Sequence, residues 1–138
     1  MAMAAKLLLS LHFILPGLTM IPQPFHLLGF GVIAVALTLF GWSILLFQLA
    51  GTAIKPFQES TTLIINGPYQ ISRNPIYLAM AMILFGLAIL LGTLTPFIAV
   101  LGFVFLIDRV FIQAEETHLK TTFPDKYPAY CRQVRRWV

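Results

Sequence analysis

Hydrophobic residues form long uninterrupted runs along this chain instead of short amphipathic repeats. The clearest run covers residues 27–50, which contain no charged side chain. A helix needs roughly 20 apolar residues to cross the hydrocarbon core of a bilayer, so this run predicts a transmembrane helix. A second uncharged run covers residues 74–107 and is too long for a single span.

The second run contains a turn signal near its middle. Residues 92–96 read Gly-Thr-Leu-Thr-Pro, a combination that is typical of a turn between helices. We therefore predict two short spans, over about residues 76–91 and 97–112, joined as a tight helical hairpin. The last helix is expected to continue beyond the bilayer as far as Pro124.

The apolar segment 6–21 allows two interpretations. Lys6 precedes an apolar run, as in a signal peptide. No small-residue cleavage site follows, and the sequence Ile21-Pro-Gln-Pro24 is typical of a turn into the next helix, which favours a retained first span. The pattern then predicts an all-α integral membrane protein with about four transmembrane helices, forming a single domain over residues 1–138.

The charged residues agree with this topology. With the amino terminus in the cytoplasm, the external loops are residues 21–26 and 92–96, and neither contains Lys or Arg. All nine basic residues then lie on or near the cytoplasmic side, as the positive-inside rule requires. The net charge of +4 therefore reflects membrane topology, and we predict no nucleic-acid partner.

The composition excludes two other classes of protein. Hydrophobic residues make up 59% of the chain and charged residues 10%, whereas soluble domains have about 25% charged residues. Cys131 is the only cysteine, so the chain is not a disulfide scaffold. The polar chemistry is confined to a cytoplasmic loop, residues 51–75, and a cytoplasmic tail, residues 113–138. The predicted hairpin places these two segments close together.

The loop ends in residues suited to binding a ligand. Asn66-Gly67-Pro68 is turn chemistry, and Pro75 suits the first turn of the helix that follows. The amino-terminal end of that helix can hold a ligand carboxylate, and Arg73 would add a cation. In the alternative interpretation, Arg73 is a topology anchor, and Tyr69 and Tyr77 belong to the interfacial aromatic belt.

Two neighbouring glutamates in the tail have different expected surroundings. Glu115 has Phe111 four residues before it and Leu119 four residues after it, so its carboxylate lies on an apolar stripe. A carboxylate there needs a cationic partner, either a ligand amine or, alternatively, Arg73 or Arg109. Glu116 has Lys120 at i+4, which predicts an exposed ion pair.

The end of the tail predicts a short cytoplasmic amphipathic helix. Tyr127, Tyr130, Cys131 and Val134 follow helical spacing, with basic residues on the other faces. This helix would either cover the loop like a lid or rest on anionic lipid, with Trp137 at headgroup level. We predict no metal site, because the three histidines do not have a metal-binding spacing.

Four motifs in order resemble the isoprenylcysteine carboxyl methyltransferase family, which is related to the membrane phospholipid methyltransferases. The motifs are Leu63-Ile-Ile-Asn-Gly-Pro-Tyr69, Arg73-Asn-Pro-Ile-Tyr77, Glu115-Glu-Thr-His-Leu119 and Phe123-x3-Tyr127-x2-Tyr130-x3-Val134-x-Arg136-Trp137. The resemblance covers about residues 55–137. One departure is Phe111, which stands where eukaryotic members carry a substrate-side arginine, and this argues against a prenylated-cysteine substrate.

The resemblance implies a membrane enzyme that transfers a methyl group from S-adenosylmethionine by in-line displacement, without a metal, and releases S-adenosylhomocysteine. It places Arg73 beside the cofactor near the acceptor, as the candidate catalytic residue. Glu116 and His118 are additional candidates. The residues that the resemblance assigns to the cofactor are Thr62, Leu63, Ile64, Tyr69, Asn74, Pro75, Ile76, Tyr77 and Glu115.

The acceptor is expected to be a lipophilic or small thiol or carboxylate, reached from the cytoplasmic face of the lipid bilayer. One alternative is a phospholipid N-methyltransferase, which would share the fold and the cofactor. The other is a non-catalytic membrane subunit or assembly factor that has kept the fold.

Overall fold

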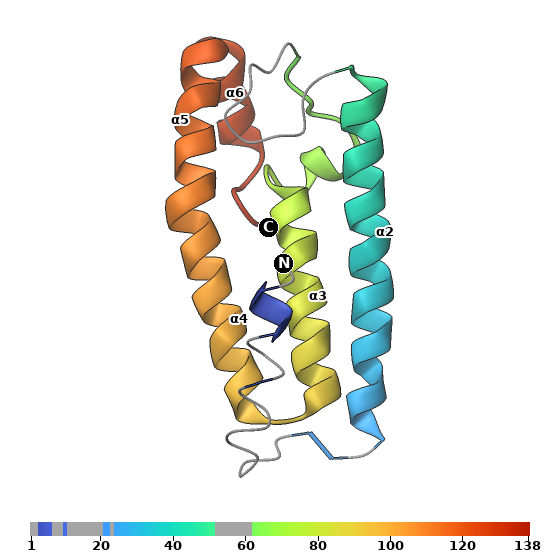
Figure 1. Ribbon diagram of the computed structural model, residues 1–138. Coiled ribbons are helices and arrows are strands. Elements are labelled where there is room, and N and C mark those ends of the chain that lie inside the picture. Colours follow the sequence, from blue (N-terminus) through green and yellow to red (C-terminus); the bar gives the residue numbers. More distant parts are fainter. Residues whose placement is uncertain (1–2, 7–9, 11–20, 23, 52–61) are drawn as a thin grey trace. The chain divides into compact units, whose positions relative to one another are not determined.

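The computed structural model of this protein describes residues 3–6, 10, 21–22, 24–51 and 62–138. The regular elements in these residues are all helical, with no strand among them. The elements are a 3-10 turn η1 (Phe25–Leu27), α2 (Leu28–Leu49), a 3-10 turn η2 (Gly67–Gln70), α3 (Pro75–Leu91), α4 (Leu94–Leu106), a π-helical segment η3 (Ile107–Ile112), α5 (Gln113–Thr122) and α6 (Lys126–Gln133) (Figure 1).

The helices lie close to where the hydrophobic runs predicted them. The run 27–50 forms α2, and the predicted span 76–91 forms α3, which begins at Pro75 as expected for a proline at the first helical position. The last helix is continuous over Leu94–Thr122 and so extends beyond the predicted span, as expected. The proposed first span, residues 6–21, lies mostly outside the described residues.

Two helices in the described part of the chain, Phe25–Leu49 and Leu94–Thr122, are long and apolar enough to cross a membrane. The apolar helix Pro75–Leu91 is shorter. Large apolar side chains on α4 are exposed, among them Leu101 at 71%. The all-helical class is therefore confirmed for the described residues, whereas the number of spans stays a prediction.

The chain divides into two compact units. The first unit comprises residues 1–38 and 79–106, and its core consists of Leu84, Ala88 and Val100 with partly buried side chains of α3 and α4 around them. The predicted turn between these helices is present. Gly92 has a φ of +67°, a conformation that glycine adopts without strain.

Helices α2 and α3 approach each other closely within this unit, at two glycines. A Cβ atom added to Gly29 would lie 2.5 Å from the carbonyl oxygen of Gly86, and one added to Gly86 would lie 2.9 Å from that of Gly29. Backbones can only come this close where neither residue has a side chain.

We expect Gly29→Ala to destabilise the protein by about 1–3 kcal/mol, because the added methyl group forces the two helices apart. Gly31→Ala is the matched control, since a Cβ atom at Gly31 would meet nothing within 4 Å. Thermal unfolding in detergent measures both variants. Equal unfolding temperatures for the two variants would contradict the close helix crossing.

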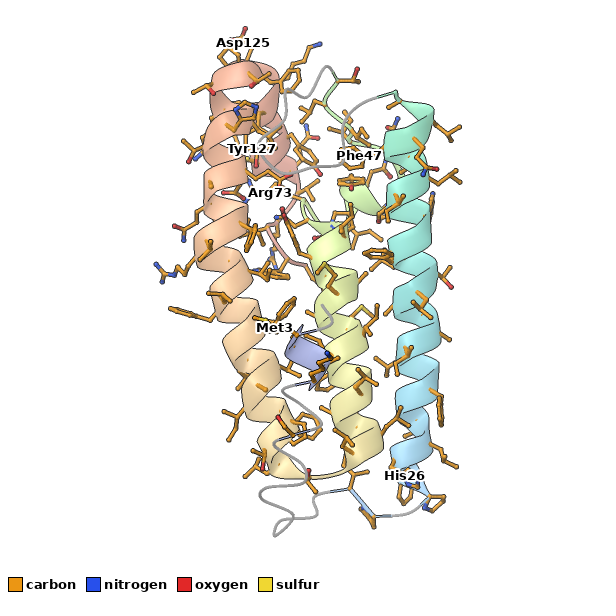
Figure 2. The ribbon with its side chains drawn as sticks, viewed as in Figure 1. Met3, His26, Phe47, Arg73, Asp125 and Tyr127 are labelled. Atoms are coloured by element: carbon orange, nitrogen blue, oxygen red, sulfur yellow. The ribbon has the colours of Figure 1, made fainter. Side chains whose placement is uncertain are left out.

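The second unit comprises residues 39–78 and 107–138 and contains every candidate site residue that sequence analysis named. Its core is a cluster of Tyr69, Tyr127, Tyr130 and Val134, which packs against partly buried side chains from α2, the loop and α5. In Figure 1, α6 folds back beside α5, and Figure 2 shows the side chains of Phe47, Arg73 and Tyr127 in this unit.

Candidate functional site

A tight turn just before α3 forms one part of the site. Gly67 has a φ of +59°, and a Cβ atom there would lie 3.1–3.3 Å from side-chain atoms of Leu46 and Trp42. Glycine suits this position because it adopts a positive φ without strain and adds no side chain to a tight space. The 3-10 turn η2 begins at Gly67, directly after Asn66, and contains the fully buried Pro68, so the predicted Asn66-Gly67-Pro68 turn is confirmed.

The turn presents Tyr69 to the interior of the unit. The Phe47 ring packs against the Tyr69 ring edge to face, with 5.7 Å between the ring centres. The Tyr130 hydroxyl donates a hydrogen bond to the Tyr69 carbonyl oxygen. Burial and the negative charge of Glu115 raise the pKa of Tyr69 well above its ordinary value, so its hydroxyl remains protonated.

A small cavity of about 170 Å³ lies beside Tyr69. The residues that line it come from the end of α2, the turn, the start of α3 and α5. They are Phe47, Tyr69, Arg73, Asn74, Pro75, Ile76, Tyr77 and Glu115. The structure thus brings the loop residues 69–77 and the carboxylate at 115 together around one cavity, as the sequence predicted.

Glu115 is held by a residue of α3. The Tyr77 hydroxyl donates a hydrogen bond to Glu115 Oε2 over 3.2 Å. This bond links the first turn of α3 to α5 across the cavity. Glu115 Oε1 takes no part in this hydrogen bond.

Arg73 lies in the wall of the same cavity, with its side chain only 13% exposed. Its Nη2 forms a salt bridge with Glu116 Oε1 over 2.9 Å. Its Nε atom is buried and has no hydrogen-bond partner among the described residues. A buried N–H group without a partner costs about 1–3 kcal/mol, which a bound acceptor would recover.

The prediction for Glu116 is wrong. Sequence spacing predicted an exposed pair with Lys120, but Glu116 is only 6% exposed and binds both Arg73 and Arg136. Spacing within one helix does not show which other segments cover that helix. Here the loop before α3 and the C-terminal residues cover the face that carries Glu116, and they bring two arginines to its carboxylate.

A second, larger cavity of about 830 Å³ lies next to the first. The two are neighbours because Tyr69 lines the smaller cavity, Tyr130 lines the larger one, and these two tyrosines are hydrogen-bonded. Thr62 and Leu63, both predicted cofactor residues, line the larger cavity. Ile64, the third residue of that stretch, packs against the tyrosine cluster instead.

Helix α6 has its apolar side turned inward. Tyr127 and Tyr130 are buried in the same cluster as Tyr69, with Leu63 and Ile64 packed against it. This arrangement agrees with the lid alternative, because the apolar side of α6 is occupied by the protein's own loop. Burial raises the pKa of Tyr127 and Tyr130, so both stay neutral.

The structure departs from the predicted set of site residues at His118, Phe47 and Tyr130. His118 is not among the described residues that line either cavity, and its buried Nε2 has no partner in the described part of the chain. Phe47 and Tyr130 contact the site but were not predicted. Phe47 lies inside a uniformly apolar run, which gives no local signal, whereas Tyr130 belongs to one of the four motifs.

The family model described as phospholipid methyltransferase matches residues 24–126 of this chain. The chain belongs to the phospholipid methyltransferase family. This match confirms the resemblance to membrane methyltransferases and covers all the residues that line the smaller cavity. Together with the two long apolar helices, membership of this family indicates a membrane-associated protein of the methyltransferase class.

The chain is also similar to a protein of Haemophilus influenzae described as uncharacterized. The two are 36% identical over 62 residues, which represent 45% of this chain and 98% of the relative. No solved structure matches this chain.

Proposed function

We propose that this protein transfers methyl groups from S-adenosylmethionine and that the smaller cavity holds the methionine part of the cofactor. The observation that carries the proposal is the pairing of an acid and an arginine around one cavity. Glu115 and Arg73 both line it, and the buried Nε of Arg73 lacks an acceptor among the described residues. This is the donor and acceptor set that a bound amino acid needs.

The charges of the cavity match those of the cofactor. Glu115 would accept hydrogen bonds from the amino group, and Arg73 Nε would donate one to the carboxylate. The rings of Phe47, Tyr69 and Tyr77 line the remaining wall. Aromatic faces stabilise a cation by about 0.5–2 kcal/mol, so these rings suit the positively charged sulfur.

The sizes of the two cavities suggest how the rest of the cofactor is held. Cavities that bind drug-sized ligands measure about 300–1,000 Å³. The smaller cavity, at about 170 Å³, suits only one end of such a molecule, whereas the neighbouring cavity of about 830 Å³ suits the nucleoside. Leu63 and Phe123 offer it an apolar surface for the base, and the Gln70 and Gln133 amides offer hydrogen bonds.

S-adenosylmethionine supplies an activated methyl group when it is bound. The protein's contribution is then to bind, orient and exclude water, and proper alignment of two reactants lowers a barrier by several kcal/mol. Tyr69 and Tyr77 would position the sulfur, and Arg73 would fix the carboxylate and face the acceptor. The tyrosine cluster and α6 would keep water from the cavity.

We further propose that the chain crosses the membrane four times with this site at the cytoplasmic face. The positive-inside distribution of Lys and Arg and the exposed apolar side chains of α2 and α4 support this topology. A lipophilic acceptor would then reach the site from the bilayer. The family match favours a phospholipid amine over the thiol or carboxylate that sequence analysis placed first.

The experiment is methyl transfer by the purified protein in lipid nanodiscs. We expect label from S-adenosylmethionine, labelled on its methyl group, to enter phosphatidylethanolamine in the lipid fraction. Label in an amphiphilic thiol or carboxylate, but not in the phospholipid, would support methyltransferase activity and assign it a different acceptor. If the protein neither transfers a methyl group nor binds S-adenosylmethionine saturably, the proposal is wrong, and the protein is better explained as a non-catalytic membrane subunit or assembly factor.

A further inference from the structure

The C-terminal residues are tied to the segment just before α3 through their backbone. The Arg73 amide donates a hydrogen bond to the Arg135 carbonyl over 3.0 Å. The Arg136 carbonyl accepts two more, from the Ser72 hydroxyl over 3.2 Å and from the Asn74 amide nitrogen Nδ2 over 3.1 Å. Two residues that line the smaller cavity, Arg73 and Asn74, are thus both bound to the C-terminal segment.

The side chains of this segment form a second set of contacts. Glu116 accepts hydrogen bonds from Arg136 through both oxygens, at 3.1 Å from Nε and 2.7 Å from Nη2, while its Oε1 also contacts Arg73. Asp108 in turn binds Arg136 Nη1 over 3.2 Å and the Trp137 indole nitrogen over 3.1 Å. Arg136 therefore lies between two carboxylates, on η3 and α5.

The geometry restricts how Arg73 can lie. Its long side chain has many rotamers, and the salt bridge to Glu116 holds its guanidinium at one place in the cavity wall. Glu116 is anchored because Arg136 binds it in a two-pronged arrangement, which fixes orientation as well as charge. The hydrogen bond to Glu116 also raises the pKa of Arg136, so its positive charge is permanent.

We propose that Arg136 is a positioning residue that fixes Arg73 in the cavity wall through Glu116 and thereby sets the affinity for the amino-acid part of the cofactor. Arg136 does not touch the cavity, and neither does Glu116, among the described lining residues. The inference rests on the proposed function, because the ligand in question is the proposed cofactor.

The test compares two neighbouring arginines in the full-length protein in nanodiscs. Arg136→Gln is expected to weaken S-adenosylmethionine binding about tenfold, the size of one lost hydrogen bond between charged groups. Arg135→Gln is the matched control: it removes the same charge from the same segment, its side chain is exposed, and its backbone carbonyl is retained. We expect its affinity to stay within about twofold of the wild type, as for a surface residue.

A second ligand separates positioning from a general loss of structure. 5′-Methylthioadenosine lacks the amino-acid part, so Arg136→Gln should bind it with the affinity of the wild type. Arg136→Lys should recover only part of the lost affinity for S-adenosylmethionine, because lysine cannot form the two-pronged contact with Glu116. Equal losses for the two ligands would overturn the proposal.

Hydrogen exchange of residues 69–74 gives a readout that needs no ligand. We expect faster exchange in Arg136→Gln than in the wild type and no change in Arg135→Gln. If the wild type binds no S-adenosylmethionine, the proposed function fails, and unchanged exchange in Arg136→Gln would then overturn the positioning role separately. Should Arg136→Gln fail to fold, Asp108→Asn loosens Arg136 from its second carboxylate and is expected to give the same pattern.

Discussion

Glu116→Gln is expected to destabilise this protein by about 3 kcal/mol, the effect of removing one partner of a buried ion pair. The substitution leaves the guanidinium groups of Arg73 and Arg136 close together with no carboxylate between them. Because Glu116 is buried, water cannot replace the lost anion. Chemical or thermal unfolding in detergent measures the loss.

Glu115→Gln is the control for this prediction, since it makes the same change one residue earlier. Glu115 accepts its hydrogen bond from the Tyr77 hydroxyl, and a glutamine side chain can still accept it. We expect the stability of this variant to change by less than about 1 kcal/mol. Equal destabilisation by the two substitutions would contradict the different surroundings that we assign to these glutamates.

A double variant sharpens the same prediction. If repulsion between the two arginines causes most of the loss in Glu116→Gln, then Glu116→Gln combined with Arg136→Gln should be more stable than Glu116→Gln alone. Residues in one network are expected to be non-additive in this way. Strictly additive losses would show that Glu116 and Arg136 are not energetically coupled.

Glu115→Gln is expected to have the largest effect on ligand binding, with S-adenosylmethionine affinity falling about 30-fold or more. Truncating or neutralising one partner of a buried charged pair commonly costs about 2 kcal/mol or more, which corresponds to that ratio. The physical reason is that the carboxylate at 115 is the acid that lines the cavity beside Tyr77. Calorimetric titration of the protein in nanodiscs measures the change.

Two controls accompany this titration. The affinity for 5′-methylthioadenosine should be the same in wild type and Glu115→Gln, because this ligand has no amino group to bind. Asp125→Asn removes an equal charge from an exposed position and should leave both affinities unchanged. Unaltered S-adenosylmethionine binding by Glu115→Gln would remove Glu115 from the proposed site.

The positions of the helices could be predicted because they depend on local chemistry. Uninterrupted apolar runs determine where α2, α3 and α4 lie, and Pro75 and Gly92 mark a helix start and a turn through their backbone preferences. The stretch 52–61 and most of the proposed first span lie outside the described residues. The sequence prediction for those segments stays a prediction.

The candidate site could be predicted only in part. The apolar neighbours of Glu115 on its own helix correctly indicated a carboxylate that faces inward, and the resemblance placed residues 69–77 beside it. Glu116 was misassigned because Lys120 is its only local partner, whereas its actual partners, Arg73 and Arg136, come from other elements. Local spacing carries no information about such contacts.

Two further contacts depend on tertiary packing alone. Nothing in the sequence around Phe47 distinguishes it from the other apolar residues of α2, yet its ring meets Tyr69. Likewise, Tyr130 was predicted on the apolar side of a helix, but its hydroxyl bond to the Tyr69 carbonyl follows from how α6 folds over the loop. The functional roles of all these residues remain predictions.

The proposed cofactor site can be tested with a crystal structure of the protein bound to S-adenosylhomocysteine. We expect ligand density in the cavity beside Tyr69, with the amino group at Glu115 and the carboxylate at Arg73 Nε. The nucleoside should lie toward Thr62 and Leu63. Density at another place on the molecule, with the cavity between residues 69–77 and Glu115 empty at saturating ligand, would contradict it.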